Sequence, residues 1–334
     1  MKLPRRKFLH LAAGAAALPA AVLPAVPRLA CAQSYPAQAI TLVVPFPAAG
    51  PADVIGRIIA EGMRASLGQA IVIENVAGAN GSVGVGRVAR ARPDGYTLSL
   101  GTWNSHVGNG ALYSLQYDLL NDFEPVSLIS TFTYLIVARK AMPAQNLREF
   151  IAWLKANPDK ASEGNPGAGS PGHVGGVLFQ NMTGTRFQFV PYRGAAPAMQ
   201  DLVAGRIDMM IDNPVTSLPH VRSGSIKAFA VTAKTRLAQA PEILTVDEAG
   251  LPGFYLSNWG ALWAPKGTPR TVIAKLNVAV ADAFADPAVR RRIADQGMGI
   301  APPEQQTPEG LRAIHRAEIE KWWPIIKAAG IKGE

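Results

Sequence analysis

The sequence predicts an α/β fold of two lobes, each a mixed sheet flanked by helices, with a cleft between them. Strand and helix signals alternate along nearly the whole chain, as in α/β proteins. About 300 residues follow the N-terminal segment, which is long for one hydrophobic core and typical of two. Two long extended runs, residues 126–138 and 256–264, are candidates for crossings between lobes. We therefore expect lobe one at 33–134 plus 258–334 and lobe two at 135–257.

The first 32 residues have the pattern of an export signal. Basic residues at positions 2 and 5–7 precede an Ala-rich apolar stretch, and Ala30-Cys31-Ala32 is an A-x-A cleavage motif. The paired arginines resemble a twin-arginine signal. Three prolines make a permanent membrane span the weaker interpretation. We expect cleavage near Ala32 and a mature protein in the periplasm that starts near Gln33.

Removal of this segment changes the charge and the cysteine content. The net charge falls from +9 to +4, because residues 1–32 carry five Lys or Arg and no Asp or Glu. A mildly basic domain gives no reason to expect nucleic-acid binding. Cys31 is the only cysteine, so the mature chain has no disulfide and no thiol nucleophile. The remaining histidines show no metal-binding spacing, and we expect neither a metal nor a cofactor.

The first strand–loop–helix unit spans residues 40–68. Residues 40–46 form a short β-branched, apolar run, typical of a strand that is covered on both faces. Pro51 suits a first helical turn, apolar residues then recur at helical spacing, and Gly68 ends the helix. Asp53 is expected to cap this helix, and its alternative role is to accept a hydrogen bond from a ligand.

The remaining elements follow in alternating order. The patterns next predict strands at 70–74 and 96–100, a helix from the glycine-rich turn 78–84 to about residue 90, and a polar loop at 101–106 before a short helix. They then predict helices at 147–155, 173–182 and 195–204, and strands at 187–191, 207–211 and 226–232. The last part is helical, with cap-plus-proline pairs at Thr268-Pro269, Asp286-Pro287 and Thr307-Pro308.

Small-residue loops precede four of these helices, at 47–53, 78–84, 167–173 and 193–197. Loops at the carboxyl ends of strands converge on a cleft, and helix N-termini there offer backbone N–H groups to an anion. The first three loops contain no Lys or Arg, so a carboxylate would be held mainly by N–H groups, hydroxyls, amides and water. Arg193 is the exception, and it either reaches the ligand or pairs with a surface carboxylate.

Other interpretations of these loops are weaker. The glycines at 78–84 do not match a dinucleotide fingerprint, and no Walker sequence is present. Ser170 and His173 are the candidates for a secreted hydrolase, but Ser170 lacks the G-x-S-x-G elbow. Asp212, at a predicted strand end, is either a ligand acceptor or a turn residue beside Asn213-Pro214.

A series of short sequence blocks runs along nearly all of residues 35–330. The most specific is VPYRGAAPAM at 190–199, and the others lie at 44–53, 74–81, 93–98, 169–173, 201–205, 249–253 and 264–269. In their order and spacing these blocks resemble the extracytoplasmic receptors of tripartite tricarboxylate transporters, the TctC or Bug family. The resemblance implies a type II-like periplasmic binding protein that holds a carboxylated solute between its lobes.

The resemblance also implies ligand contacts from the loop after the first strand of each lobe and from flanking loops. Together with Asp212, the expected ligand-binding residues are Phe46, Pro47, Ala48, Ala49, Gly50, Asp53, Thr102, Trp103, Asn104, Asn165, Gly167, Ala168, Gly169, Ser170, His173, Arg193, Gly194 and Ala195. The sequence departs from the family pattern in the first loop, where Ala49 stands for a glycine and Pro51 offers no N–H. Asn165 and Pro171 replace residues that are usually Ser, and Trp103 is expected to add an aromatic wall.

We expect a receptor that binds a small carboxylate anion, closes around it and delivers it to an integral-membrane permease, without catalysis. It is expected to be a monomer and to bind no nucleic acid. One alternative is a ligand sensor that presents its closed form to a signalling protein. The other is the hydrolase with Ser170 and His173, which turnover of an ester or amide would reveal.

Overall fold

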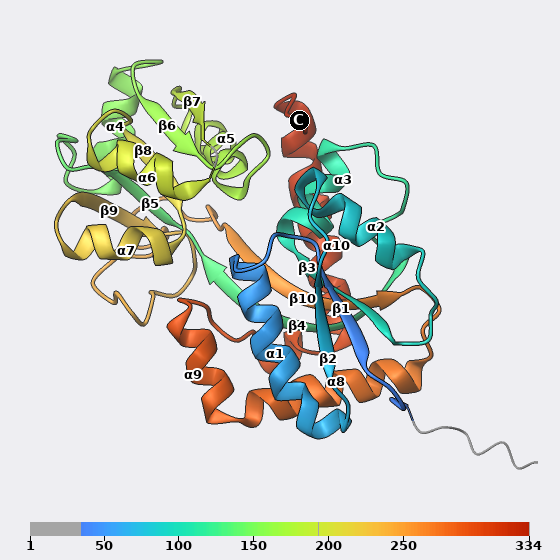
Figure 1. Ribbon diagram of the computed structural model, residues 1–334. Coiled ribbons are helices and arrows are strands. Elements are labelled where there is room, and N and C mark those ends of the chain that lie inside the picture. The colour runs from blue at the N-terminus through green and yellow to red at the C-terminus, as the bar shows by residue number, and fades with distance from the viewer. Residues whose placement is uncertain (1–34, 193, 334) are drawn as a thin grey trace, which may run out of the picture. The chain divides into compact units, whose positions relative to one another are not determined.

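The computed structural model describes residues 35–192 and 194–333, so the predicted export signal and Arg193 lie outside the described residues. The described chain contains two five-stranded mixed sheets (Figure 1). No helix in this part of the chain is long and apolar enough to cross a membrane.

The first sheet has the strand order β2-β1-β3-β10-β4. Its strands are β1 (Ile40–Val44), β2 (Ile71–Asn75), β3 (Thr97–Thr102), β4 (Phe123–Thr133) and β10 (Ser257–Pro265). β1 pairs in parallel with β2 and β3, whereas β10 runs antiparallel to β3 and β4. The position of β1 inside the sheet, between β2 and β3, explains its largely apolar, β-branched sequence, because helices cover both faces of this sheet.

The second sheet repeats this arrangement with the order β7-β6-β8-β5-β9. Its strands are β5 (Leu135–Arg139), β6 (Ser162–Asn165), β7 (Gln188–Pro191), β8 (Met209–Asp212) and β9 (Ile226–Val231). β6 pairs in parallel with β7 and β8, and β5 runs antiparallel to β8 and β9. β6 therefore occupies the position that β1 occupies in the first sheet, and the loops after these two strands are equivalent.

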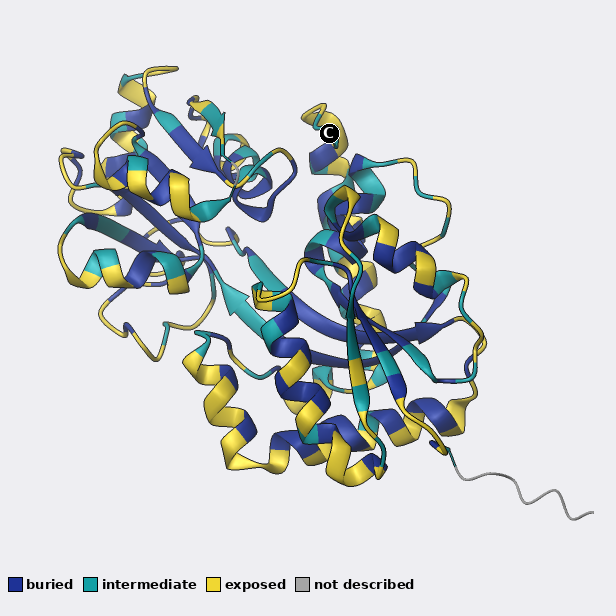
Figure 2. Ribbon diagram, viewed as in Figure 1, coloured by how far each residue is buried: buried dark blue, intermediate teal, exposed yellow. Residues whose placement is uncertain are grey.

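Helices lie on both faces of each sheet. On the first sheet, α1 (Pro51–Leu67), α8 (Arg270–Ala285) and α9 (Pro287–Asp295) pack in one apolar cluster, and α2 (Ser82–Ala89), α3 (Asn109–Leu112) and α10 (Pro308–Ala328) in another. The second cluster continues into α4 (Leu147–Ala156) and α5 (Pro171–Thr183) of the second sheet, and α6 (Ala195–Val203) and α7 (Pro214–Arg222) form a third. Figure 2 shows the buried strands enclosed by helices with exposed outer faces.

The chain passes between the sheets at two places, as the extended runs predict. β4 continues into β5 through Tyr134, and the chain returns into β10 after Leu256. Thr232 ties both passages together, because its hydroxyl donates to the Leu256 carbonyl at 2.7 Å and accepts from the Tyr134 N–H at 3.0 Å. These hydrogen bonds hold the two crossing segments side by side.

Helix starts agree with two of the three predicted caps. The Asp286 carboxylate accepts from the Ala288 N–H at 2.8 Å, and the Thr307 hydroxyl accepts from the Gly310 N–H at 3.0 Å. The prediction for Thr268-Pro269 was wrong, since α8 begins at Arg270 and the Thr268 hydroxyl donates to the Pro265 carbonyl instead. Three short helical turns complete the fold: η1 (Ala79–Gly81), η2 (Asn104–Gly108) and η3 (Pro303–Gln305).

Candidate functional site

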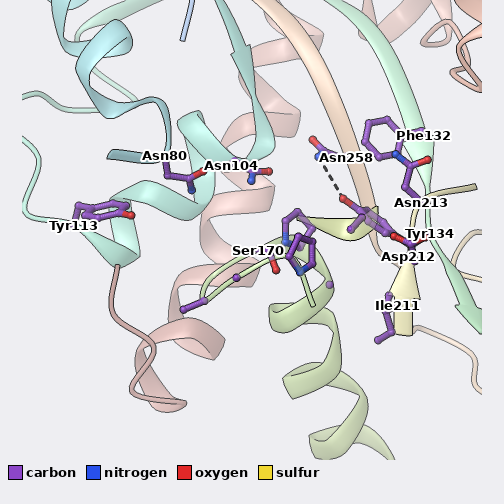
Figure 3. A pocket seen from close by; sticks show the side chains of 16 residues that line it. Asn80, Asn104, Tyr113, Phe132, Tyr134, Ser170, Ile211, Asp212, Asn213 and Asn258 are labelled. Carbon is purple, nitrogen blue, oxygen red and sulfur yellow. Dashed lines mark hydrogen bonds between the residues drawn. The ribbon is translucent and has the colours of Figure 1, made fainter. Parts of the chain in front are cut away.

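Two adjoining pockets of about 480 and 340 Å³ form a cleft whose walls come from both sheets. We call the larger the polar half and the smaller the apolar half. They share the side chains of Asn104, Phe132, Asn213 and Asn258. Figure 3 shows the polar half, with Asn80 and Asn104 on one wall and Ser170 and Asp212 on the other.

The loop after β1 reaches the apolar half and is held from behind by Asp53. The Asp53 carboxylate accepts from the Ala49 N–H at 2.9 Å, from Arg57 Nε at 2.9 Å and from Asn75 Nδ2 at 3.0 Å. The bond from Arg57 is the main reason that the pKa of this carboxyl falls to about 2. Asp53 is thus ionised and almost fully buried, and it orders the loop rather than lining the cleft.

Asp53 does not cap α1, which corrects our expectation. The N-cap residue is Gly50, which has no side chain to accept from the helix, and Pro51 is the first helical residue. The first turn of α1 therefore lacks a side-chain cap, and Gly50, Pro51 and Ala52 line the apolar half. An uncapped helix start places backbone N–H groups and the positive end of the helix dipole at the wall.

The loop after β6 reaches the polar half and is held by neutral groups. Asn165 Oδ1 accepts from the Gly167 N–H at 3.1 Å, and His173 Nδ1 accepts from the Gly169 N–H at 3.0 Å. Burial lowers the pKa of His173, so the ring is neutral and keeps Nδ1 as an acceptor. The ring also packs on Phe189, with centroids 4.6 Å apart.

Ser170 and His173 do not make the contact that the hydrolase alternative needs. The Ser170 hydroxyl caps α5 by accepting from the backbone N–H of His173 at 3.3 Å, and the His173 ring accepts from Gly169. A nucleophile and its general base require a hydrogen bond between the hydroxyl and the imidazole. Both side chains instead order the loop.

Asp212 lies at the end of β8, lines the polar half and is 3% exposed. Its carboxylate accepts from Ser217 Oγ at 2.6 Å and from the Thr216 hydroxyl, while burial raises its pKa. The neighbouring Asn213 caps α7 by accepting from the Val215 N–H at 2.7 Å. Asp212 thus has the predicted turn role, because it holds the first turn of α7, and it also borders the cleft.

The structure brings about half of the expected residues to the cleft wall. Those that line it are Phe46, Pro47, Gly50, Thr102, Asn104, Gly167, Ala168, Ser170, Ala195 and Asp212. Those that lie behind the wall or beside it are Ala48, Ala49, Asp53, Trp103, Asn165, Gly169, His173 and Gly194. Arg193 belongs to the part that the structure does not describe.

Trp103 does not supply the expected aromatic wall. It is fully buried, its indole N–H donates to Glu318 Oε2 at 2.8 Å, and its ring lies edge-on to Trp322 at 5.7 Å. Trp103 thus ties η2 to α10 in the core. The aromatic side chains at the cleft come instead from the crossing segments, where Phe132 and Tyr134 line it.

Gly169, expected to bind the ligand, does not line the cleft and lies instead next to the opposite wall. It has φ +72°, and a Cβ atom there would lie 2.5 Å from Leu112 Cδ1 of α3. Leu112 belongs to the first sheet's helices, whereas Gly169 follows a strand of the second sheet. The absent side chain therefore permits close approach of the two walls.

Several cleft residues were not among the expected ligand-binding residues, and most of them follow no motif. They include Asn80, Tyr113, Ile55, Ser130, Phe132, Tyr134, Asn213, Asn258, Trp259 and Met298. The available signal was the pair of extended crossing runs, since strands that join two lobes must border the cleft between them. Among the described residues that line the cleft, Asp212 is the only Asp, Glu, Lys, Arg or His.

Metal chemistry finds no support in the described part of the chain. There, no group of three or more His, Cys, Asp or Glu side chains could hold a metal ion.

Known proteins share this architecture and sequence. A protein from the TAR-I ttuE–ttuC′ intergenic region of Agrobacterium vitis is 39% identical over 310 residues, covering 91% of this chain and 88% of its own. The structure of MatC from Rhodopseudomonas palustris with bound malate is 38% identical, with a TM-score of 0.74, covering 87% of this chain and all of its own.

A second R. palustris structure, with adipate, is 33% identical with a TM-score of 0.76, covering 89% of this chain and 99% of its own. The fold is thus that of two-domain periplasmic binding proteins. The model of the tripartite tricarboxylate transporter family receptor matches residues 55–331. This chain belongs to the tripartite tricarboxylate transporter receptor family, the TctC or Bug receptors.

Proposed function

We propose that this protein is a periplasmic receptor that captures a small carboxylate anion and delivers it to a tripartite tricarboxylate-type permease. The observation that carries the proposal is the cleft itself. Loops at equivalent ends of two sheets meet there, and the starts of α1, α5 and α6 contribute to its walls. Backbone N–H groups, amides and water hold the carboxylate, as helix starts and polar loops can.

Ligand-induced stabilisation tests this function directly. The mature protein is heated with a panel of carboxylates that includes malate and adipate, the acids named for the two R. palustris structures. A ligand at 100 times its Kd should add roughly 2.7 kcal/mol to the free energy of unfolding. Stabilisation by esters or amides with their turnover, and none by carboxylates, would contradict the receptor.

The proposed lobes are residues 33–134 plus 258–334 and residues 135–257, and they close on the ligand. Two crossing segments make a hinge, and a ligand that contacts both lobes favours the closed state. Small-angle scattering with a stabilising ligand should show a smaller radius of gyration than without it. An unchanged radius for a ligand that binds tightly would argue against closure.

Export and oligomeric state are tested separately. N-terminal sequencing of protein from the periplasm should begin near Gln33, and a lipid-modified Cys31 would contradict the soluble form. Light scattering of the mature protein should give the mass of a monomer. Deletion of the receptor gene should abolish solute uptake, and a plasmid-borne copy of the gene should restore it. This result would distinguish a transport receptor from a sensor.

A further inference from the structure

Two contacts across the cleft pair a glycine of one proposed lobe with a branched aliphatic side chain of the other. Gly297 follows α9 in lobe one, and a Cβ atom there would lie 2.6 Å from Val215 Cγ2 on α7 in lobe two. The Gly169 contact with Leu112 of α3 has the reverse arrangement, with the glycine in lobe two. Each lobe therefore supplies one glycine and one aliphatic side chain.

The two contacts adjoin different halves of the cleft without lining it. Gly297 precedes Met298, which lines the apolar half, and Gly169 precedes Ser170, which lines the polar half. None of the four contacting residues belongs to either lining. A substitution at either glycine would thus affect a ligand through the distance between the walls rather than by direct contact.

Gly297 is held firmly by its own lobe. Its N–H donates to the Ala294 carbonyl of α9 at 2.8 Å. Two residues further on, Gly299 exchanges two backbone hydrogen bonds with Thr131 of β4, at 2.7 and 2.9 Å. These bonds fix the segment to α9 and β4, so Gly297 cannot retreat from an added side chain.

Val215 is held equally firmly on the other side. Its N–H donates to Asn213 Oδ1 at 2.7 Å, and the next turn of α7 is tied to Asp212 by Ser217 Oγ at 2.6 Å. A β-branched side chain on a helix has one strongly preferred rotamer, so the Val215 methyl group cannot easily turn aside. Extra volume at Gly297 would therefore be accommodated by separation of the two walls.

We propose that Gly297 and Val215 form a closure contact that sets the affinity for solutes without touching them. The inference rests on the proposed function, because it assigns this pair to the closed state of the two lobes. Apart from chain neighbours, Val215 is the only described residue within 4 Å of a Cβ atom at Gly297, so one side chain limits the approach. A ligand that needs the closed state has an apparent Kd that rises as this state becomes less populated.

An engineered disulfide tests whether the contact forms and whether it controls ligand exchange. A Cβ atom at Gly297 would lie 3.9 Å from the Val215 Cβ, within the roughly 3.5–4.5 Å of disulfides. The chain from Gln33 onward contains no cysteine, so two introduced thiols would be its only ones. The double variant Val215→Cys, Gly297→Cys should form a disulfide on mild oxidation. The oxidised form should release a bound carboxylate roughly 100-fold more slowly than the reduced form, since its lobes cannot separate.

The control variant is Gly68→Cys with Val215→Cys. Gly68 also follows a helix of lobe one and has φ +66°, but an added Cβ there meets no atom within 4 Å. This control should form no intramolecular disulfide. Absence of the disulfide in the test variant, or equal ligand release from its oxidised and reduced forms, overturns the inference. If the disulfide forms but the reduced protein binds no carboxylate, the closure contact is supported and the receptor function is contradicted.

Alanine variants measure the effect on affinity by calorimetry with malate, adipate or another carboxylate that stabilises the wild type. Gly297→Ala should weaken every such carboxylate by the same factor, about fivefold or more, because fewer molecules reach the closed state. Gly68→Ala shares the positive φ and should leave affinity unchanged. Adding Val215→Ala to Gly297→Ala should restore binding, since the nearest remaining atom of residue 215 is its Cβ at 3.9 Å. A loss that Val215→Ala does not reverse, or that Gly68→Ala reproduces, would overturn the inference.

Discussion

The loops after β1 and β6 occupy equivalent positions in the two sheets but are ordered by different chemistry. An ionised carboxylate, Asp53, organises the first through Ala49, Arg57 and Asn75. Neutral acceptors on Asn165, Ser170 and His173 organise the second. In both loops a side chain accepts from a backbone N–H group, but the acceptor is charged in the first loop and neutral in the second.

The difference follows from the neighbours of each loop. Arg57 lies one turn after Asp53 on α1 and is half-exposed, so it stabilises the carboxylate without itself being buried. In the second loop, His173 packs on Phe189 and burial lowers its pKa, so a charged ring there would be costly. Local solvation therefore decides which chemistry each loop can use, and acid affects the two loops in different pH ranges.

The largest effect is expected from removal of the Asp53 carboxylate, which holds the loop after β1. Asp53→Ala removes the acceptor for three donors, and hydrogen bonds to charged groups contribute roughly 1.5–3 kcal/mol each. We expect the free energy of unfolding to fall by about 3 kcal/mol. Urea denaturation measures it, with Glu61→Ala as the control, because the exposed Glu61–Arg292 pair should contribute under about 0.5 kcal/mol. An equal loss of unfolding free energy in both variants would show that Asp53 does not stabilise the loop after β1.

The next effect concerns the close approach of the second loop to α3. Gly169→Ala places a Cβ atom 2.5 Å from Leu112 Cδ1 and should weaken ligand binding by about 2 kcal/mol. Gly184→Ala is the matched control, since Gly184 has φ +65° with no atom within 4 Å of an added Cβ. Both share the backbone strain, so only Gly169→Ala should change affinity. Failure of Leu112→Ala to restore binding in the double variant would argue against this contact.

A smaller effect is expected from removal of the His173 ring, the neutral acceptor that holds the loop after β6. His173→Leu removes the acceptor for the Gly169 N–H and should reduce the free energy of unfolding by about 1 kcal/mol. His173→Asn retains an acceptor at the position of Nδ1 and should recover part of the loss. If the two variants are equally destabilised, packing on Phe189 rather than the hydrogen bond explains the effect.

As pH falls, the contributions of His173 and Asp53 to the free energy of unfolding should be lost in different pH ranges. The folded state lowers the pKa of His173 from 6.5, so the unfolded state binds the proton more readily and the His173 contribution declines as pH falls below 6.5. The Asp53 pKa is lowered from 3.8 to about 2, so its contribution is complete above pH 3.8 and is lost as pH falls towards 2. The difference in the free energy of unfolding between the wild type and His173→Asn should change in the first pH range. The corresponding difference between the wild type and Asp53→Asn should change in the second. If the Asp53 contribution were lost at a higher pH than the His173 contribution, these roles of the two residues would be contradicted.

The smallest effect is expected at Ala49, a non-glycine residue with φ +63°. Ala49→Gly relieves a left-handed conformation that costs an L-residue roughly 1–2 kcal/mol, but it adds freedom to the unfolded chain. We expect a net gain of about 0.5 kcal/mol in the free energy of unfolding. Ala48→Gly, without positive φ, should instead lose stability. A loss in both variants would show that the loop tolerates Ala49 without strain.

The sequence by itself determined the features that depend on neighbours along the chain. The alternation of strands and helices, the two crossing runs, and the caps at Asp286 and Thr307 all follow from local periodicity and backbone chemistry. The family resemblance, carried by ordered sequence blocks, was confirmed by the family model. The strands, helices and caps could be predicted because each is encoded within a few successive residues, and the family because its blocks keep their order and spacing along residues 35–330.

Only the tertiary structure decided where the side chains of the site point. Trp103 and Asn104 are adjacent, yet one lies in the core against Trp322 and the other lines the cleft. Asp53 was expected at a helix cap, but Asn75 of the neighbouring strand and the Ala49 N–H draw its carboxylate behind the loop. Packing between elements far apart in the chain sets these directions, and local sequence patterns do not contain that information.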